Sequence, residues 1–459
     1  MTLSVDQSEI QFDTLADRIT GAVVLSGDPG WDTARQPWNL ANDQRPNAVV
    51  LPADADDISA VVLFAKNNGL RVVPQGTGHL ASPLGDLTGS ILLNTSSIKW
   101  IDIDPDDQVV RVGAGVVWGE VTSALAGTGL TALAGSSSDV GVVGYTLGGG
   151  YSWLSREYGL AASSVTAIDV VTSDGELRHL TGDSNSELFW ALRGGGGNSA
   201  IVTAIAFEVV PIADVYAGML MYPLDRAPEV FTAYERWTRD LTDHATTCVR
   251  LLRLPPMPEL PDFLRGQSFV VVDGAINTSD AEADTLLAPL RDLNPSIDTF
   301  ARIPTDQLAL MHMDPPAPVP AVSDGMILDA LTPAAIETLM QLAGPDIESA
   351  LLLVDLRHLG GAVGRRDPRG GAVDHLPGRF LLYTVGIAPD AVTAGIVGRE
   401  VRRLIESLTP WASDKDYSNF REATASPKRF YSTGVLARLR AVKRAYDPAN
   451  VIRTSHELI

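Results

Sequence analysis

The chain has 459 residues, a length that exceeds one compact core and implies about two to four cores. Hydrophobic residues make up 45% of the chain and charged residues 20%, which is typical of a globular protein and excludes a disordered one. The formal charge of −21 repels nucleic-acid phosphates and anionic lipid head groups, so we expect neither nucleic acid nor a membrane surface as a partner.

Cysteines, histidines and apolar runs narrow the class of protein further. Cys248 is the only cysteine, which excludes a disulfide framework, and the seven histidines show no metal-ligand spacing, so no metal site is expected. The first twenty residues lack the basic-then-apolar run of a secretion signal, and no apolar run approaches the roughly 18 residues of a membrane span. We therefore expect a cytoplasmic protein, either a monomer or a homodimer.

Residues up to about 211 alternate between predicted strands and helices. The spacing of the apolar residues between Ile58 and Ala65 predicts a helix over 54–70, with Asp54 or Asp56 as its N-cap. Ser173-Asp174-Gly175 lies between two strand-like segments and predicts a hairpin. A shorter helix is expected over 116–126, and strands over 48–51, 71–73, 91–93, 109–112 and 202–210. This alternation indicates an α/β unit.

The pattern of predicted elements changes between residues 212 and about 410. Helices predicted over 227–241 and 279–290 alternate with strands predicted over 268–272, 351–356 and 380–385, and proline clusters mark loops at 255–258 and 315–320. These features indicate a second domain. The remaining residues, 411–459, are too few for a core of their own and should return to one of the other units.

Several familiar motifs are absent or misplaced. The chain has no Gly-Lys dipeptide, no Gly-x-Ser-x-Gly and no His-Glu-x-x-His, which argues against a phosphate loop, an α/β-hydrolase nucleophile and a zinc protease. The segment 195–200 matches Gly-x-Gly-x-x-Ala, but the β-branched run 201–207 follows it where a nicotinamide site needs a helix. The interpretation of the chain as a nicotinamide dehydrogenase would depend on this misplaced pattern alone.

Three glycine-rich loops, at 75–79, 135–150 and 193–198, lie within the first half of the chain. Glycine lets a backbone approach a ligand closely, and successive backbone N–H groups can bind a pyrophosphate without a cationic side chain. Each glycine also costs conformational entropy, so three such loops in one unit exceed what ordinary turns require. The loops therefore predict a large, phosphate-bearing cofactor that is held mainly by main chain.

The ordered set of motifs resembles the berberine-bridge-enzyme-like FAD-linked oxidases, which belong to the vanillyl-alcohol-oxidase class of flavoproteins. The resemblance is carried by Gly-Thr-Gly-His at 76–79, by the glycine-rich run 135–150, by Leu-Phe-Trp-Ala-Leu-Arg-Gly-Gly-Gly at 188–196, and by Tyr-Ser-Asn-Phe at 417–420 with Tyr-Asp-Pro-Ala-Asn at 446–450. It covers nearly the whole chain in the right order, and the set is far more specific than any one motif.

This resemblance implies an α+β fold with three parts. Residues 40–211 would form a PCMH-type FAD-binding domain of two α/β subdomains, with residues 1–39 packed on it. Residues 212–410 would form a substrate-binding domain, an antiparallel sheet backed by helices. Residues 411–459 would return to the FAD-binding domain and help to close the site.

The resemblance also implies FAD joined covalently to His79 alone. The second link, through a cysteine, that many relatives add is not expected, because Ser137 stands at that cysteine position. It implies an oxidoreductase that takes a hydride from a small-molecule alcohol or amine and passes the electrons to O2, giving H2O2, in bacterial secondary metabolism or catabolism. A dehydrogenase of the same fold with another electron acceptor, and a flavin-binding protein without turnover, stay open as alternatives.

Further cofactor contacts are implied on the glycine-rich loops and on the strand that follows them. Two positions depart from the family pattern, because Ala200 replaces a glycine and Gln75 replaces a common arginine. The implied contacts are Gln75, Gly76, Thr77, Gly78, Leu80, Gly135, Ser136, Val140, Gly141, Gly144, Tyr145, Gly148, Gly149, Gly150, Ile201, Val202 and Asn419.

The proton acceptor for the reaction is left among several candidates. Tyr417 and Asn419 belong to the C-terminal motif, and Tyr383 lies on the strand predicted over 380–385. On the preceding strand, alternation places Asp355 and Arg357 on one face and Leu356 and His358 on the other. Only one of these two pairs can face the flavin.

Overall fold

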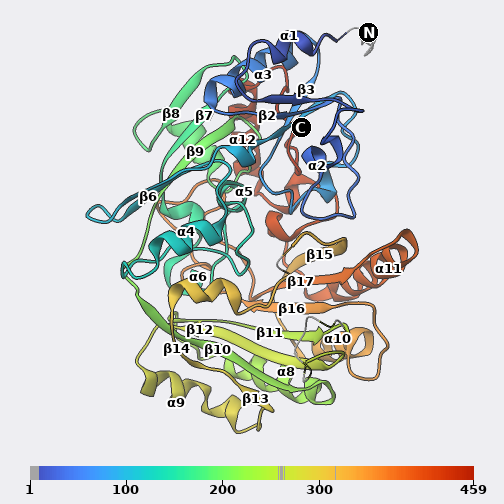
Figure 1. The fold of residues 1–459 in the computed structure, drawn as a ribbon. Helices are drawn as coiled ribbons and strands as arrows, with labels where there is room; N and C mark the ends of the chain where they lie inside the picture. The colour runs from blue at the N-terminus through green and yellow to red at the C-terminus, as the bar shows by residue number, and fades with distance from the viewer. Residues whose placement is uncertain (1–9, 257, 259–261, 263, 316) are drawn as a thin grey trace.

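The computed structural model describes residues 10–256, 258, 262, 264–315 and 317–459. Residues 1–9, which were predicted to pack on the FAD-binding domain with the rest of 1–39, lie outside this range. Three β-sheets follow one another along the chain; in Figure 1 the first two lie at the top and the third at the bottom.

The first sheet has four strands in the order β1-β2-β4-β3, in which β1 is antiparallel to β2 while β2 and β3 run parallel to β4. Helix α3 packs Ile58, Val61 and Val62 against this sheet, and it begins after Asp54, whose side chain accepts the backbone N–H of Asp57. The elements are α1 (Asp13–Ala16), β1 (Ala22–Val24), α2 (Trp31–Arg35), β2 (Ala48–Leu51), α3 (Ala55–Asn67), β3 (Arg71–Gln75), η2 (Ser82–Leu84), β4 (Ser90–Asn94) and η3 (Thr95–Ser97).

The second sheet has five antiparallel strands in the order β5-β6-β9-β7-β8. Strand β9 is buried over almost its whole length, which explains its β-branched sequence and why the glycine run before it does not lead into a helix. The elements are β5 (Ile101–Asp104), β6 (Val109–Gly113), α4 (Trp118–Leu125), α5 (Val142–Leu147), α6 (Ser155–Tyr158), η4 (Ala161–Ser164), β7 (Val165–Val171), β8 (Leu177–Leu180), α7 (Ser186–Leu192) and β9 (Ile201–Glu208).

The third sheet is antiparallel, with the strand order β13-β10-β12-β11-β16-β17-β15 and with β14 paired to β10. Its elements are β10 (Asp214–Pro223), η5 (Leu224–Arg226), α8 (Ala227–Trp237), β11 (Ala245–Arg253), β12 (Ser268–Ile276), α9 (Asp280–Arg291), β13 (Ile297–Asp298), β14 (Ala301–Pro304), η6 (Thr305–Leu310), β15 (Ala321–Leu328), α10 (Pro333–Ala343), β16 (Leu353–His358), β17 (Phe380–Ile387) and α11 (Ala391–Leu408).

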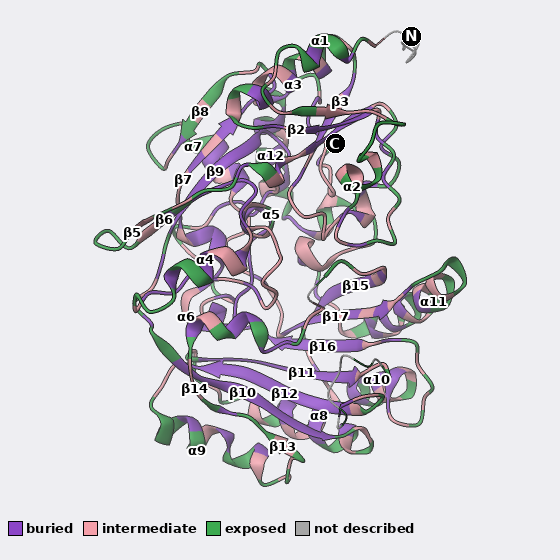
Figure 2. Ribbon diagram, in the orientation of Figure 1, coloured by how far each residue is buried: buried purple, intermediate pink, exposed green. Residues whose placement is uncertain are grey.

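The two faces of the third sheet have different partners. Apolar side chains of one face, such as Val249 and Leu356, form a core with the helices α8, α9, α10 and α11. The other face is turned toward the first two sheets. The central strands of this sheet are buried, as the purple strands of Figure 2 show, because they are covered on both sides.

The C-terminal segment lies against the first half of the chain. It contains η7 (Thr409–Trp411), η8 (Ser418–Phe420), η9 (Pro427–Arg429) and α12 (Thr433–Tyr446). The buried Lys443 ammonium donates to Asn198 O at 2.6 Å, to Asp447 Oδ2 at 2.6 Å and to Ile452 O at 2.9 Å, so each of its three protons has an acceptor. Ile452 also forms a parallel bridge with Val72 of β3.

The expected α+β fold is confirmed, with a cofactor half of mixed and antiparallel sheets and an antiparallel sheet backed by helices. The predicted helix at 54–70 and the hairpin at 173–175 are present as α3 and the β7–β8 turn, and Asp54 rather than Asp56 is the N-cap. Among the described residues, no helix is both long and apolar enough to cross a bilayer.

Candidate active site

Tyr417 and Asn419 lie in the turn around η8, close to the glycine-rich run at 148–150. The Tyr417 hydroxyl oxygen accepts the backbone N–H of Gly150 and the side-chain Nδ2 of Asn419, each at 2.9 Å. Asn419 Nδ2 also donates to Tyr145 O at 2.9 Å, so both of its protons are used. The phenol oxygen is therefore held by two donors, while its own proton is left for another acceptor.

The electrostatics of Tyr417 follow from the same contacts. Burial raises the pKa of the Tyr417 phenol, whereas the hydrogen bonds from Gly150 and Asn419, together with the nearby Arg357 guanidinium, act to lower it. All three of these groups favour the phenolate over the phenol.

Three consecutive glycines allow this turn to dock. A Cβ on Gly148 would collide with the Asn419 side chain, and one on Gly149 would lie 3.3 Å from the Tyr417 ring. Gly149 and Gly150 have φ of +124° and +80°, a region that favours glycine. These glycines, predicted as cofactor contacts, thus have a second role as the seat of the C-terminal motif.

The register of the third sheet decides which face of β16 meets the first half of the chain. Arg250, Asp355 and Tyr383 are direct cross-strand partners on β11, β16 and β17, so their side chains share one face. Leu356 is on the opposite face, in the core beneath the helices. The sequence left open which of the two residue pairs on β16 faces the flavin. The register shows that Asp355 and Arg357 face the first two sheets.

His358 lies at the end of β16, away from this polar face. Its ring contacts the Phe380 ring, and Arg156 Nη1 lies 3.4 Å from its Nε2. Burial, reinforced by the positive charges of Arg156 and Arg379, lowers the pKa of His358 to about 2. Its imidazole is therefore neutral at physiological pH.

The polar face carries paired charges that are removed from water. Arg250 Nη2 lies 2.8 Å from Asp273 Oδ2, with side chains 1% and 0% exposed, and Arg357 Nε lies 2.8 Å from Asp355 Oδ2. Burial alone would raise the pKa of Asp355, but the charges of Arg357 and His312 outweigh it and hold that pKa well below its usual value. The Asp355 carboxylate is thus ionised, and the Arg357 guanidinium compensates its charge.

Arg357 and Phe420 connect this face to the glycine-rich loops. Arg357 Nη2 lies 3.3 Å from the Ser136 hydroxyl, and its guanidinium lies over the Phe420 ring at 4.9 Å. The Phe420 ring is 4.9 Å from that of Tyr383 and 5.4 Å from that of Tyr417, measured between centroids. The predicted candidates Tyr383 and Tyr417 therefore converge from two elements on one aromatic ring.

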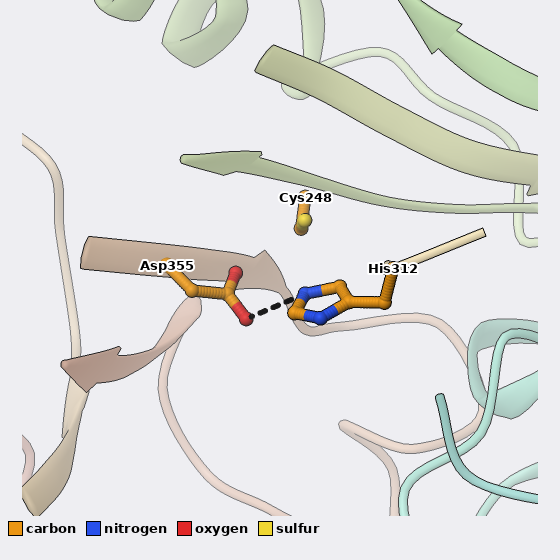
Figure 3. A group of neighbouring side chains, drawn as sticks. All are labelled: Cys248, His312 and Asp355. Atoms are coloured by element: carbon orange, nitrogen blue, oxygen red, sulfur yellow. Dashed lines mark ion pairs between the residues drawn. The ribbon is translucent and has the colours of Figure 1, made fainter. Parts of the chain in front are cut away.

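A sulfur, an imidazole and a carboxylate also meet on this face. Potential ligand atoms of Cys248, His312 and Asp355 lie within 4.8 Å of one another. Figure 3 shows the three neighbouring side chains. The Asp355 carboxylate is already paired with Arg357, and Cys248 Sγ donates to Asp273. Because burial raises the pKa of the Cys248 thiol well above its usual value, the thiol stays protonated, which disfavours metal binding.

Arg250, Asp273 and His312 are the residues of this face that the sequence analysis missed. In the segment Ala245–Arg253, Arg250 stands between Val249 and Leu251, and a charge at such a position signals a buried polar site. His312 lies outside the strands. Its Nε2 is 3.5 Å from Asp355 Oδ2, and no sequence pattern predicts this contact.

His79 lies on the loop after β3, held by its neighbours. Its ring stacks on Trp38 with centroids 4.4 Å apart and planes 18° apart, and Thr77 Oγ1 lies 2.8 Å from its Nδ1. Its Nε2 is 3.4 Å from Asp139 Oδ1 on the second glycine-rich loop. The two loops thus meet at this imidazole.

The main chain of these loops has the properties that an FAD site requires. Among the described residues, the backbone N–H groups of 76–80 and 136–140 find no hydrogen-bond acceptor. A Cβ on Gly76 or Gly141 would meet no atom closer than 3.8 Å, and one on Gly144 would meet none within 4 Å. Neither packing nor a positive φ calls for glycine at these three positions, so they fit a main-chain cradle approached by a cofactor.

Other predicted cofactor contacts are engaged within the protein. Gln75 accepts a hydrogen bond from Gln44, the Gly135 backbone packs on the Tyr145 ring, and the Tyr145 hydroxyl donates to Leu133 O. The main-chain oxygen of Leu80 accepts the Ser455 hydroxyl, and that of Val140 accepts the Trp118 backbone N–H. The side chains of Ile201 and Val202 lie in apolar cores.

Comparison with known proteins gives matches over both ends of this site. Residues 46–181 match the family described as FAD binding domain, and residues 416–457 match the family described as berberine and berberine like. The FAD-linked oxidoreductase YgaK of Bacillus subtilis is 27% identical, over 95% of this chain and 96% of its own length. The (R)-6-hydroxynicotine oxidase of Paenarthrobacter nicotinovorans is 26% identical, over 96% and 97%.

Solved structures share the fold along the whole chain. BBE-like 1 of Physcomitrella patens superposes with a TM-score of 0.86 at 19% identity, covering 98% of this chain and 99% of that one. The 6-hydroxy-D-nicotine oxidase of Arthrobacter nicotinovorans gives 0.82 at 23% identity, covering 95% and 97%. With the two family matches and the relatives that span nearly the whole chain, one conclusion follows: the chain is an FAD-linked oxidoreductase that carries an FAD-binding domain and a berberine-like C-terminal segment.

Proposed function

We propose that this enzyme oxidises a small-molecule alcohol or amine, that its FAD is bound covalently through His79 alone, and that O2 is its electron acceptor. The observation that carries the proposal is the Tyr417 hydroxyl, which is held by Gly150 and Asn419 beside the cradle, with its proton directed elsewhere. Bound FAD would supply the hydride acceptor, which O2 reoxidises with release of H2O2.

Tyr417 is the group best placed to take the substrate proton. Loss of a hydride from a C–H next to oxygen or nitrogen requires removal of the hydroxyl or amine proton, which a phenolate can accept. The donors from Gly150 and Asn419 stabilise that phenolate, and Arg357 adds a positive charge nearby. Asn419 positions Tyr417, because both of its protons are committed to Tyr417 and Tyr145.

Tyr383 contributes to the substrate side of the same space. It lies opposite Asp355 in the sheet, and its ring packs on Phe420. Burial raises the pKa of the Tyr383 phenol, and the negative charge of Glu422 acts in the same direction. Tyr383 is therefore suited to donate a hydrogen bond to a substrate oxygen or nitrogen rather than to accept its proton.

His79 is the residue to which we assign the covalent link. Its ring is fixed by Trp38, Thr77 and Asp139 between the two loops of the cradle. Ser137 has a hydroxyl in place of a thiol and donates it to Asp139, and Cys248 is fully buried in the third sheet, so neither is suited to form a second link.

An absorption spectrum combined with acid precipitation and peptide mapping tests the proposal. The purified protein should be yellow, its colour should remain in the acid precipitate, and one flavin peptide should contain residue 79. His79→Ala should release all flavin on precipitation. Peroxide should form under air with an oxidisable alcohol or amine; reduction of the flavin without peroxide would show another acceptor, and a colourless protein that stays so with added FAD would contradict the whole proposal.

A further inference from the structure

Asp139 belongs to a small cluster that surrounds His79. Its Oδ1 accepts the Ser137 hydroxyl at 3.0 Å and lies 3.4 Å from His79 Nε2, and its Oδ2 accepts the Trp38 indole N–H. Trp38 in turn stacks on the His79 ring and donates its backbone N–H to Thr77 O at 2.8 Å. Every member of the cluster thus fixes either the imidazole or the carboxylate.

The Asp139 carboxylate is ionised in this setting. Burial would raise the pKa of Asp139, but hydrogen bonds and charge from His79, with the donors Ser137 and Trp38, hold it below the usual value. An ionised carboxylate next to an imidazole nitrogen favours the tautomer that carries its proton on that nitrogen. The Nδ1 lone pair of His79 then faces the Thr77 hydroxyl, which donates to it.

We infer that Asp139 is a positioning residue for covalent flavin attachment: it holds the proton on His79 Nε2, so that Nδ1 is the nucleophile that forms the link. The inference rests on the proposed attachment at His79 and adds the atom that reacts and the residue that prepares it. The arrangement parallels the way in which a carboxylate orients a histidine for other reactions, by fixing its tautomer and stabilising the imidazolium that forms.

The chemical balance of the step is closed by dioxygen. A bond forms between His79 Nδ1 and the 8-methyl carbon of FAD, and one C–H bond of that methyl group breaks. The Nε2 proton passes to Asp139, the electron pair of the broken C–H bond enters the flavin ring, and O2 removes two electrons. Two protons are released, one from nitrogen and one from carbon, and they combine with O2 and the two electrons to give H2O2. The Thr77 side chain must rotate off Nδ1 during this step.

The attachment rate in the full-length protein tests the inference. Protein produced under riboflavin limitation is mixed with FAD in air, and flavin that remains with acid-precipitated protein is measured over time. Asp139→Asn keeps the shape but not the charge, so we expect attachment to slow at least about tenfold while non-covalent FAD binding persists. Asp139→Glu should restore much of the rate. Asp183→Asn, at an exposed turn, is the matched control.

Each result bears on a different claim. Attachment by Asp139→Asn at the wild-type rate would overturn the role of Asp139 and leave the His79 link standing, whereas wild-type protein without covalent flavin would overturn the link itself. NMR of the isolated histidyl-flavin peptide identifies the linked nitrogen without any variant: a bond at Nδ1 supports the inference, and a bond at Nε2 overturns it.

Discussion

The two sides of the active site are built from different parts of the chain. The side that we propose for the cofactor, called the cofactor side below, presents main chain, in the N–H groups of 76–80 and 136–140 and at glycines such as Gly144. The substrate side presents side chains from four strands, with charges paired out of contact with water at Arg250–Asp273 and Asp355–Arg357. A backbone cradle suits a cofactor shared by a whole family, whereas a side-chain face can be changed one residue at a time.

The largest effect is expected where the two sides meet, at Tyr417. Tyr417→Phe removes the proposed proton acceptor but keeps the ring against Phe420. We expect the rate of flavin reduction to fall about 10²–10⁴-fold, as measured by anaerobic stopped flow. Tyr431→Phe, which also removes a buried phenol, is the control. Unchanged reduction in Tyr417→Phe would remove this residue from the mechanism.

The next largest effect is expected from breaking a buried ion pair on the substrate side. Arg250→Met leaves the Asp273 carboxylate buried without its partner, so we expect a loss of about 3–5 kcal/mol in the free energy of unfolding. Arg438→Met breaks an exposed pair with Glu187 and should cost less than about 1 kcal/mol. Denaturant titration of both variants compares them, and equal losses would show that burial of the first pair carries no special weight.

Two alanine substitutions separate the two kinds of glycine on the cofactor side. Gly148→Ala places a methyl group against Asn419, and we expect a loss of about 1–3 kcal/mol in stability from this overpacking. Gly144→Ala meets no atom within 4 Å and sits inside helix α5, so the free energy of unfolding should stay the same or rise by up to about 1 kcal/mol, while FAD retention falls. Equal FAD retention in Gly144→Ala and wild type would argue against a cradle at that glycine.

A pH dependence is expected at the edge of the substrate side. Burial, with the nearby Asp324 carboxylate, raises the pKa of Glu422 to about 7, although the Ser82 and Ser323 hydroxyls oppose this. Its protonated form is thus favoured in the folded state, so stability is fully present below the unfolded pKa and is lost as pH rises through about 7.

Glu422→Gln imitates the protonated form and removes this loss. Between about pH 5 and 8, the free energy of unfolding of wild type should fall by about 1–3 kcal/mol relative to that of Glu422→Gln. Thermal unfolding at both pH values measures the difference, and Glu337→Gln on the exposed face of α10 is the matched control. A constant difference between the two proteins would show that the Glu422 carboxyl is ionised throughout.

The sequence predicted the fold well, because the fold depends on local patterns. Apolar spacing and an N-cap place α3, and a glycine run followed by β-branched residues places β9. The docking role of Gly148 could not be predicted, since it depends on Asn419, far along the chain. The glycine signal therefore marked these loops but did not separate a glycine expected to contact a cofactor from one that contacts another part of the protein.

The substrate side was predicted only in part, for a physical reason. Alternation along β16 grouped Asp355 with Arg357, but which face they occupy depends on the register with β11 and β17. The partners Asp273 and His312 come from another strand and from a loop, and no local pattern joins them to Asp355. The charges at Arg250 and Asp273, each next to apolar residues of its strand, were further signals of this face available from the sequence.

The Lys443 contacts with Asn198, Asp447 and Ile452 impose an order of events during biosynthesis. Residues 449–453 complete the edge of the first sheet beside Val72, and His456 Nε2 donates to the carbonyl of Arg421 at 2.9 Å, in the turn that carries Tyr417. The ribosome therefore makes these residues hundreds of residues after the first strands of the compartment that they finish. Stable loading of the cofactor must wait until translation has passed this point.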